Sequence, residues 1–111
     1  MSHDLFDVFS RMVADLPARA IPTALELQCH MLEDDAEHHR LASPEDACSI
    51  LCFRRFVQTA KTGEAMEQLQ PFPADHIEFY KETIARLIQA DELPQSAMGR
   101  FDSTFASQRL S

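Results

Sequence analysis

Side chains that can do chemistry are concentrated in one short stretch of the sequence, CHMLEDDAEHHRL, at residues 29–41. It holds three His, one Cys and four acids within thirteen positions. Imidazole, thiolate and carboxylate groups are the usual protein ligands of transition metals. The stretch therefore raises two alternatives, a metal site or the solvent-exposed face of an ordinary helix.

Helical spacing favours the solvent-exposed face. The segment from Pro22 to about Arg40 is predicted to be one helix, and its residues sort into faces at about 100° per residue. The main apolar face consists of Leu25, Cys29, Leu32 and Ala36. A second, smaller apolar strip consists of Ala24, Leu27 and Met31, with His38 beside it. The polar row on the side away from both consists of Glu26, His30, Glu33 and Glu37.

A metal centre in a helical bundle needs ligands that project inward from facing helices, such as a Glu-x-x-His pair on each of two helices. The nearest approach to that pattern is Asp35-x-x-His38. Cys48 and Cys52 lie four residues apart and can ligate one soft metal ion. Unpaired Cys more often packs as a small apolar residue, and we favour that interpretation. The candidate metal ligands are therefore His30, Asp35, His38, Cys48 and Cys52, while no metal or other cofactor is predicted.

The sequence contains no motif typical of an enzyme. With only two Gly, it has no glycine-rich phosphate loop, and it has no nucleophile elbow or HExxH pattern. His76 and Tyr80 lie one helical turn apart and can act as an acid and a base. A polar-tipped pair at the edge of an apolar helix face is the interpretation that we favour for them. We expect no catalytic residues.

The apolar pattern is helical nearly throughout, which predicts an all-α fold. The first four expected helices end near Asp15, Arg40, Lys61 and Ala90, and Pro94 opens a short last helix. Ser43-Pro44-Glu45-Asp46 is the best helix start in the chain. Thr62-Gly63 is expected to end the third helix, and a further helical turn or two is expected from Glu64 to Gln70. We predict one compact domain over residues 1–111, a bundle of four to five amphipathic helices with a frayed tail at 107–111.

The charge of the chain is negative and unevenly distributed. Ten Lys and Arg against 18 Asp and Glu give 10 − 18 = −8. Between Glu26 and Asp46 there are seven acids and one base, which gives 1 − 7 = −6. Such an excess repels nucleic-acid phosphates and anionic membranes, so neither is an expected partner.

The N-terminus lacks the basic region of a secretory signal, and no apolar run approaches the roughly 20 residues that span a bilayer. Three Cys is an odd number, which is unsuited to a closed disulfide framework and typical of reduced cytosol. These observations predict a cytoplasmic location.

Two apolar residues fall among polar ones. Phe79 lies on the polar side of the fourth expected helix, and Leu51 lies on the polar side of the third. Since folding gains nothing from an apolar side chain on a solvated face, we expect a partner to cover them. The predicted partner interface consists of Leu51, Phe79, Glu82 and Arg86.

The sequence thus favours a small helical protein-interaction module or subunit, expected as a homodimer, without catalysis of its own. One alternative is a metal-binding helical bundle with His, Asp and Cys ligands. A third hypothesis, an acidic decoy that occupies a nucleic-acid-binding protein, would need a longer ordered array of carboxylates.

Overall fold

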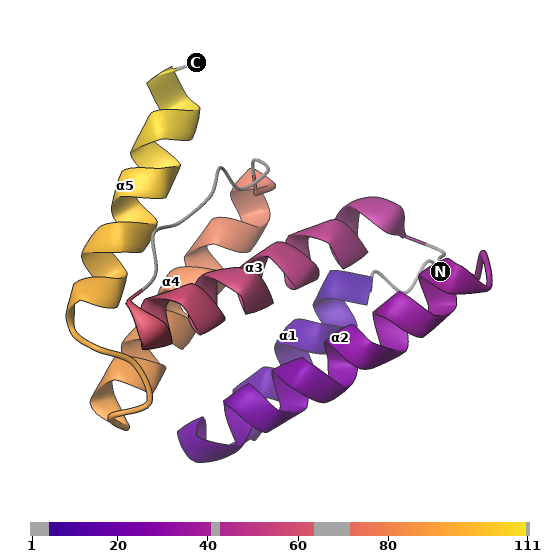
Figure 1. Cartoon of the computed structure of the whole chain (residues 1–111), viewed down its shortest axis with the longest axis horizontal. Helices are drawn as coiled ribbons and strands as arrows, with labels where there is room; N and C mark the ends of the chain where they lie inside the picture. The colour runs from indigo at the N-terminus through magenta and orange to yellow at the C-terminus, as the bar shows by residue number, and fades with distance from the viewer. Residues whose placement is uncertain (1–4, 41–42, 64–71, 111) are drawn as a thin grey trace.

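The computed structural model describes residues 5–40, 43–63 and 72–110, with only the helical backbone described for 104–110. Within these residues the chain is all-α, which confirms the predicted fold class (Figure 1). The elements in order are α1 (Leu5–Asp15), the 3-10 helix η1 (Ala18–Ala20), α2 (Ile21–Glu37), α3 (Pro44–Thr62), α4 (Ala74–Gln89) and α5 (Ser96–Leu110). The possible turn at Glu64 to Gln70 lies outside the described residues. The last helix continues to Leu110, through most of the segment that was expected to fray.

Helix α3 begins and ends where the sequence predicts. Pro44 opens it and Gly63 closes it in the left-handed conformation, with φ of 76°, and the Gly63 amide donates to the Thr59 carbonyl at 2.9 Å. The role of Ser43 differs from a simple cap. Its hydroxyl makes no capping hydrogen bond to the backbone and instead lies 3.4 Å from the Asp46 carboxylate.

Helix α2 ends three residues before the predicted end at Arg40. His38 is its C-terminal cap, and His39 has a positive φ of 57°. The last turn of α2 carries acids and no base. Since the C-terminus of a helix is the negative end of its dipole, acids there disfavour a further turn.

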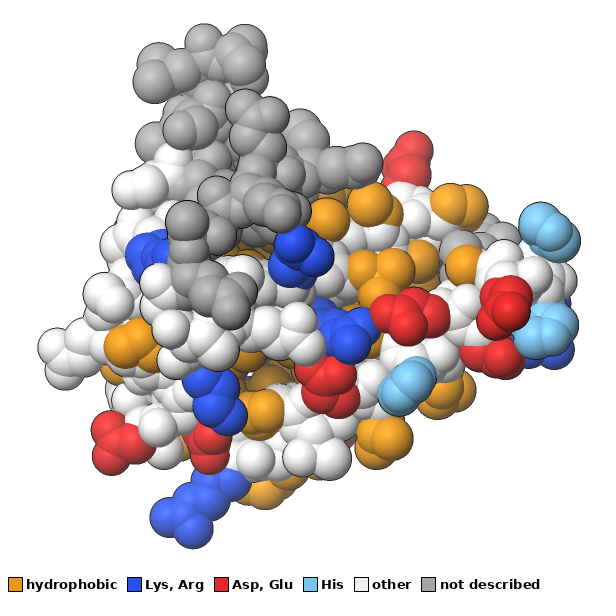
Figure 2. All heavy atoms as spheres, viewed as in Figure 1, with side chains coloured by type: hydrophobic (Ala, Val, Ile, Leu, Met, Phe, Trp, Pro, Cys, Tyr) orange, Lys and Arg blue, Asp and Glu red, His pale blue; other side chains and the backbone are white. Residues whose placement is uncertain are grey.

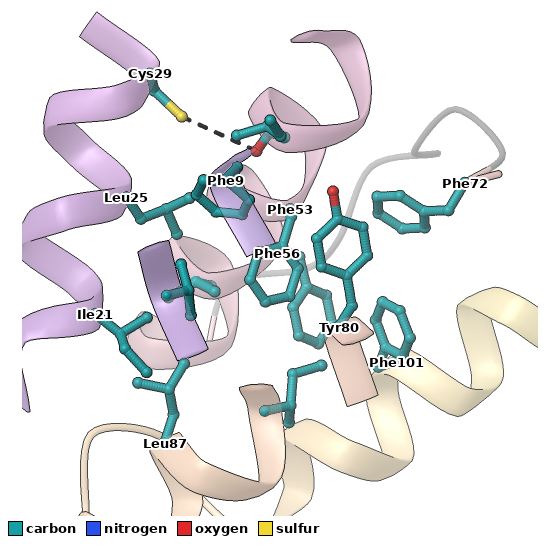
Figure 3. Packing of buried hydrophobic residues seen from close by; sticks show 14 of the residues in the cluster. Phe9, Ile21, Leu25, Cys29, Phe53, Phe56, Phe72, Tyr80, Leu87 and Phe101 are labelled. Carbon is teal, nitrogen blue, oxygen red and sulfur yellow. Dashed lines mark hydrogen bonds between the residues drawn. The ribbon is translucent and has the colours of Figure 1, made fainter. Parts of the chain in front are cut away.

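Helix α3 lies at the centre of the bundle and packs against α1, α2 and α5. Helix α4 contacts α3 through Tyr80, whose ring stacks on Phe53 of α3 with centroids 4.2 Å apart. Phe72 and Phe101 continue the aromatic core toward α5 (Figure 3). Each of the four rings is at least nine-tenths buried.

Among the residues described, no helix has both the length and the apolarity that crossing a bilayer requires.

The two leucines Leu87 and Leu27 offer a matched test of this core. Leu87 is fully buried, whereas Leu27 is 61% exposed. Leu87→Ala should lower the free energy of unfolding by about 2–5 kcal/mol, because it leaves a cavity. Leu27→Ala should change it by less than about 0.5 kcal/mol. Urea unfolding followed by circular dichroism measures both values, and equal losses would contradict this packing.

Candidate functional site

Four polar side chains form a network between α3 and α4 in the interior of the bundle. The Ser49 hydroxyl lies 2.7 Å from the Tyr80 hydroxyl and 2.9 Å from Nδ1 of His76. Nε2 of His76 lies 3.6 Å from the Asp46 carboxylate. His76 and Tyr80 are therefore buried core residues, and the prediction of a pair at the edge of the apolar face is wrong. Ser49 and Asp46 were not predicted as partners of His76, because no local sequence motif links residues on α3 to a residue on α4.

The donor and acceptor roles in this network depend on the tautomer of His76. In the tautomer with its proton on Nε2, that N–H faces the Asp46 carboxylate, Nδ1 accepts from the Ser49 hydroxyl, and Ser49 accepts from Tyr80. Burial raises the pKa of Tyr80 above its usual range, so its hydroxyl keeps its proton.

The Asp46 carboxylate lies where the first turns of three helices meet. It belongs to the first turn of α3, it accepts from the Phe6 amide in the first turn of α1 at 3.2 Å, and it faces His76 in the first turn of α4. Helix N-termini carry unpaired N–H groups and the positive end of the helix dipole. The N-termini of α3 and α1 therefore favour a carboxylate at this point, and α4 reaches it through the His76 ring.

Asp46, His76 and Ser49 have the residue types of a hydrolytic triad, but their surroundings indicate a structural role. A nucleophilic Ser must reach a substrate carbonyl, with donors placed for the oxyanion. Ser49 is only 5% exposed and already bonds to Tyr80. The Phe6 ring stacks directly on His76, with centroids 3.5 Å apart. The network therefore joins α1, α3 and α4.

A groove between α1 and α4 is the surface that best fits an interaction site. It has a volume of about 520 Å³. Its lining consists of Ser10, Arg11, Ala14, Phe79, Glu82, Thr83 and Arg86. The structure thus brings together three of the four predicted interface residues, whereas Leu51 lines a different surface on α3.

Two of these residues also serve the fold, contrary to the expectation from helical spacing. The Phe79 ring makes edge contacts with Phe6 and Phe9, at 5.5 and 6.1 Å between centroids. The Arg86 guanidinium donates to the carbonyls of Val13 and Leu16 at the end of α1. The premise that folding gains nothing from Phe79 is therefore wrong, because α1 packs over the face of α4 that helical spacing alone marks as solvated. Leu51 is likewise partly buried against the core.

Charged side chains stand on both walls of the groove, with Arg11 on α1 and both Glu82 and Arg86 on α4. Among the described residues, the one ion pair of Arg11 on α1 is an exposed pair with Asp7, at 3.2 Å. Glu82 on α4 is exposed and makes no ion pair or hydrogen bond with the described residues. Both side chains are available to a partner, since an exposed ion pair within one helix is weak.

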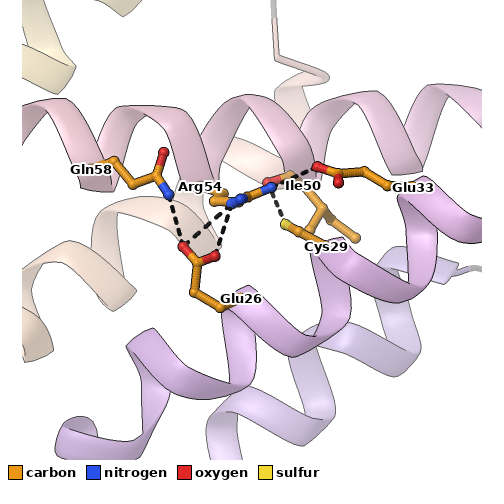
Figure 4. Close-up of polar contacts among 6 residues, drawn as sticks. All are labelled: Glu26, Cys29, Glu33, Ile50, Arg54 and Gln58. Carbon is orange, nitrogen blue, oxygen red and sulfur yellow. Dashed lines mark hydrogen bonds and ion pairs between the residues drawn. The ribbon is translucent and has the colours of Figure 1, made fainter.

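The polar row of α2 is not uniformly solvated, because Arg54 of α3 reaches across to it (Figure 4). The guanidinium lies 2.7 Å from Glu33 and 3.2 Å from Glu26, and Gln58 donates to Glu26 at 2.8 Å. Cys29 is fully buried beneath this pair, with its thiol 3.9 Å from the Ile50 carbonyl. These contacts hold α2 against α3.

The candidate metal ligands lie on separate surfaces. His30 is exposed, Asp35 pairs with Arg40 at 3.3 Å, and Nδ1 of His38 lies 2.9 Å from the Asp34 carbonyl. Cys48 and Cys52 line a groove on α3. In the part of the chain that the structure describes, no three His, Cys, Asp or Glu side chains are grouped to hold a metal ion.

Comparison with known protein families, curated proteins and solved structures finds no match to this chain.

Replacing Asp46 should lower the free energy of unfolding far more than replacing the adjacent Glu45. Asp46→Ala removes the acceptor of the Phe6 amide and should lower the free energy of unfolding by about 1.5–3 kcal/mol. Glu45→Ala is the matched control, since Glu45 is exposed in the same turn and should cost less than about 1 kcal/mol. Urea unfolding tests both. Similar losses would show that Asp46 acts only through the α3 dipole.

Cys29 should make stability depend on pH. Burial raises the pKa of its thiol from 9.0 to about 11, although the Arg54 guanidinium opposes this. Above pH 9 the unfolded thiol ionises while the folded one stays protonated, so stability should fall as pH rises, by up to about 2–3 kcal/mol near pH 11.

Urea unfolding between pH 8 and pH 10 measures this slope below the range where Tyr80 ionises in the unfolded chain. Cys29→Ala removes the titrating group, so its slope should be shallower than that of the wild type. Parallel pH profiles for the two proteins would contradict the assignment to Cys29.

Proposed function

We propose that this chain is a small helical protein-interaction module without catalysis of its own, and that it self-associates through the groove between α1 and α4. The observation that carries the proposal is the make-up of the groove. Its lining includes the Phe79 ring, with Arg11 on the α1 wall and both Glu82 and Arg86 on the α4 wall, and Arg86 is occupied by carbonyls at the end of α1. Apolar contact surrounded by complementary charge is typical of protein–protein interfaces.

A second copy of the chain is the partner that this charge arrangement favours. In a two-fold dimer every contact between two different residues occurs twice, because each protomer contributes both residues to the interface. If α1 of one protomer lies against α4 of the other, Arg11 and Glu82 pair twice, once on each side of the axis. Phe79 and Ala14 then lie between the two ion pairs. Leu51 is not part of this surface.

The net charge of −8 supports protein rather than nucleic acid as the partner. The odd number of Cys supports a reducing compartment such as the cytoplasm.

A charge exchange between the two walls tests the dimer. Arg11→Glu and Glu82→Arg should each raise the dimer Kd by about tenfold, because each places like charges opposite one another. The double variant restores the pairing with its signs reversed, so its Kd should return to within about threefold of the wild type. Analytical ultracentrifugation or light scattering over a concentration series measures these values.

Lys61→Glu is the matched control, since it makes the same change of charge at an exposed residue outside the groove. It should leave the Kd nearly unchanged. Phe79→Asp is a poor test, because it also disrupts the contacts with Phe6 and Phe9. A wild-type chain that stays monomeric at high micromolar concentration, or a double variant without recovery, would overturn the proposed dimer.

A further inference from the structure

The outer edge of α2 exposes two large apolar side chains to solvent. Leu27 is 61% exposed and Met31, one turn further along, is 62% exposed. They belong with the half-buried Ala24 to the smaller apolar strip that helical spacing defines. The main apolar face of α2 packs inward through Leu25 and Leu32, so the strip is left on the outside.

This edge lies on the most acidic helix of the chain. Helix α2 contains five acids and no Lys or Arg. Arg54 pairs with two of these acids from α3, and Arg40 pairs with two others after the helix ends. Five acids against two Arg leave 2 − 5 = −3 for α2 as a whole together with these two Arg partners. Figure 2 shows hydrophobic side chains along the lower border of this face, with acidic and His side chains near the end of α2.

We propose that this α2 edge, formed by Ala24, Leu27 and Met31, binds a basic amphipathic helix of a partner protein. Leu27 and Met31 have the i, i+4 spacing that fits the apolar stripe of such a helix. The unbranched Met side chain adapts to the shape of what it contacts. At 100° per residue, Asp34 and Asp35 flank this strip on either side, so basic side chains beside the stripe of the partner helix would meet these two acids.

The same charges argue against the other occupants of this edge. A second copy of the chain would bring two acidic α2 helices together, and like charges in an interface are unfavourable. An anionic lipid surface would be repelled for the same reason. The proposal does not depend on the dimer, because the α2 edge shares no residue with the α1–α4 groove.

The test uses the full chain and two labelled synthetic peptides. One is a 15-residue amphipathic helix of Leu and Lys, and the other has Glu in place of every Lys. Fluorescence anisotropy at about 150 mM salt should show that the Lys peptide binds at least about tenfold more tightly than the Glu peptide. The double variant Leu27→Ser, Met31→Ser should weaken binding of the Lys peptide by about tenfold or more, because it removes the apolar contact.

Val8→Ser is the matched control, since Val8 is 53% exposed on α1 and outside this edge. Its Kd for the Lys peptide should stay within about twofold of the wild type. Circular dichroism establishes that all variants keep their helices. Equal binding of both peptides, no binding of the Lys peptide, or binding unaffected by the double variant would each overturn the proposal.

The result is separable from that for the dimer. Arg11→Glu should weaken self-association and leave binding of the Lys peptide intact. If the wild type proves monomeric, the peptide experiment still tests the α2 edge, because all residues of this edge belong to one chain.

Discussion

The arrangement of the bundle depends on the Asp46 carboxylate, which lies where three helices begin. It belongs to α3, accepts the Phe6 amide of α1 and faces His76 of α4. A charge removed from water costs free energy unless donors and favourable dipoles replace its hydration. Here the Phe6 amide, the Ser43 hydroxyl and the His76 ring are the groups that face the carboxylate. The junction therefore fixes where α1 and α4 stand relative to α3.

Helix α1 is held at both ends, and this creates the surface that we propose for self-association. Its start is bound by Asp46, and its last carbonyls accept from Arg86 of α4. Between these points the rings of Phe6 and Phe9 contact Phe79. The groove walls thus stand on helices whose relative position is fixed by the core. A rigid surface loses little conformational freedom on binding, which favours association.

Most of the acids of α2 form ion pairs with Arg residues of the same chain. Arg54 uses two carboxylates of α2 to hold that helix against α3, and Arg40 closes the end of α2 on two more. Its acids are therefore partly structural, whereas the apolar strip of α2 remains outside the core. The groove between α1 and α4 therefore carries charges of both signs, whereas the exposed apolar edge belongs to the acidic helix α2. One small bundle can in this way present two surfaces of different chemistry.

The sequence by itself determined the helical class and most helix boundaries, because periodicity, Pro44 and Gly63 act within a few residues of the chain. It also separated the two apolar strips of α2, and it placed Phe79, Glu82 and Arg86 on one helix face. Only the tertiary structure decided what covers each face. Helical spacing alone places Phe79 on a solvated face, whereas in the folded chain α1 packs over it. It likewise places His76 at the edge of an apolar face, whereas in the folded chain His76 is buried against Ser49 and Asp46 of α3. Contacts between residues far apart in the chain arise from packing, and spacing within one helix cannot specify them.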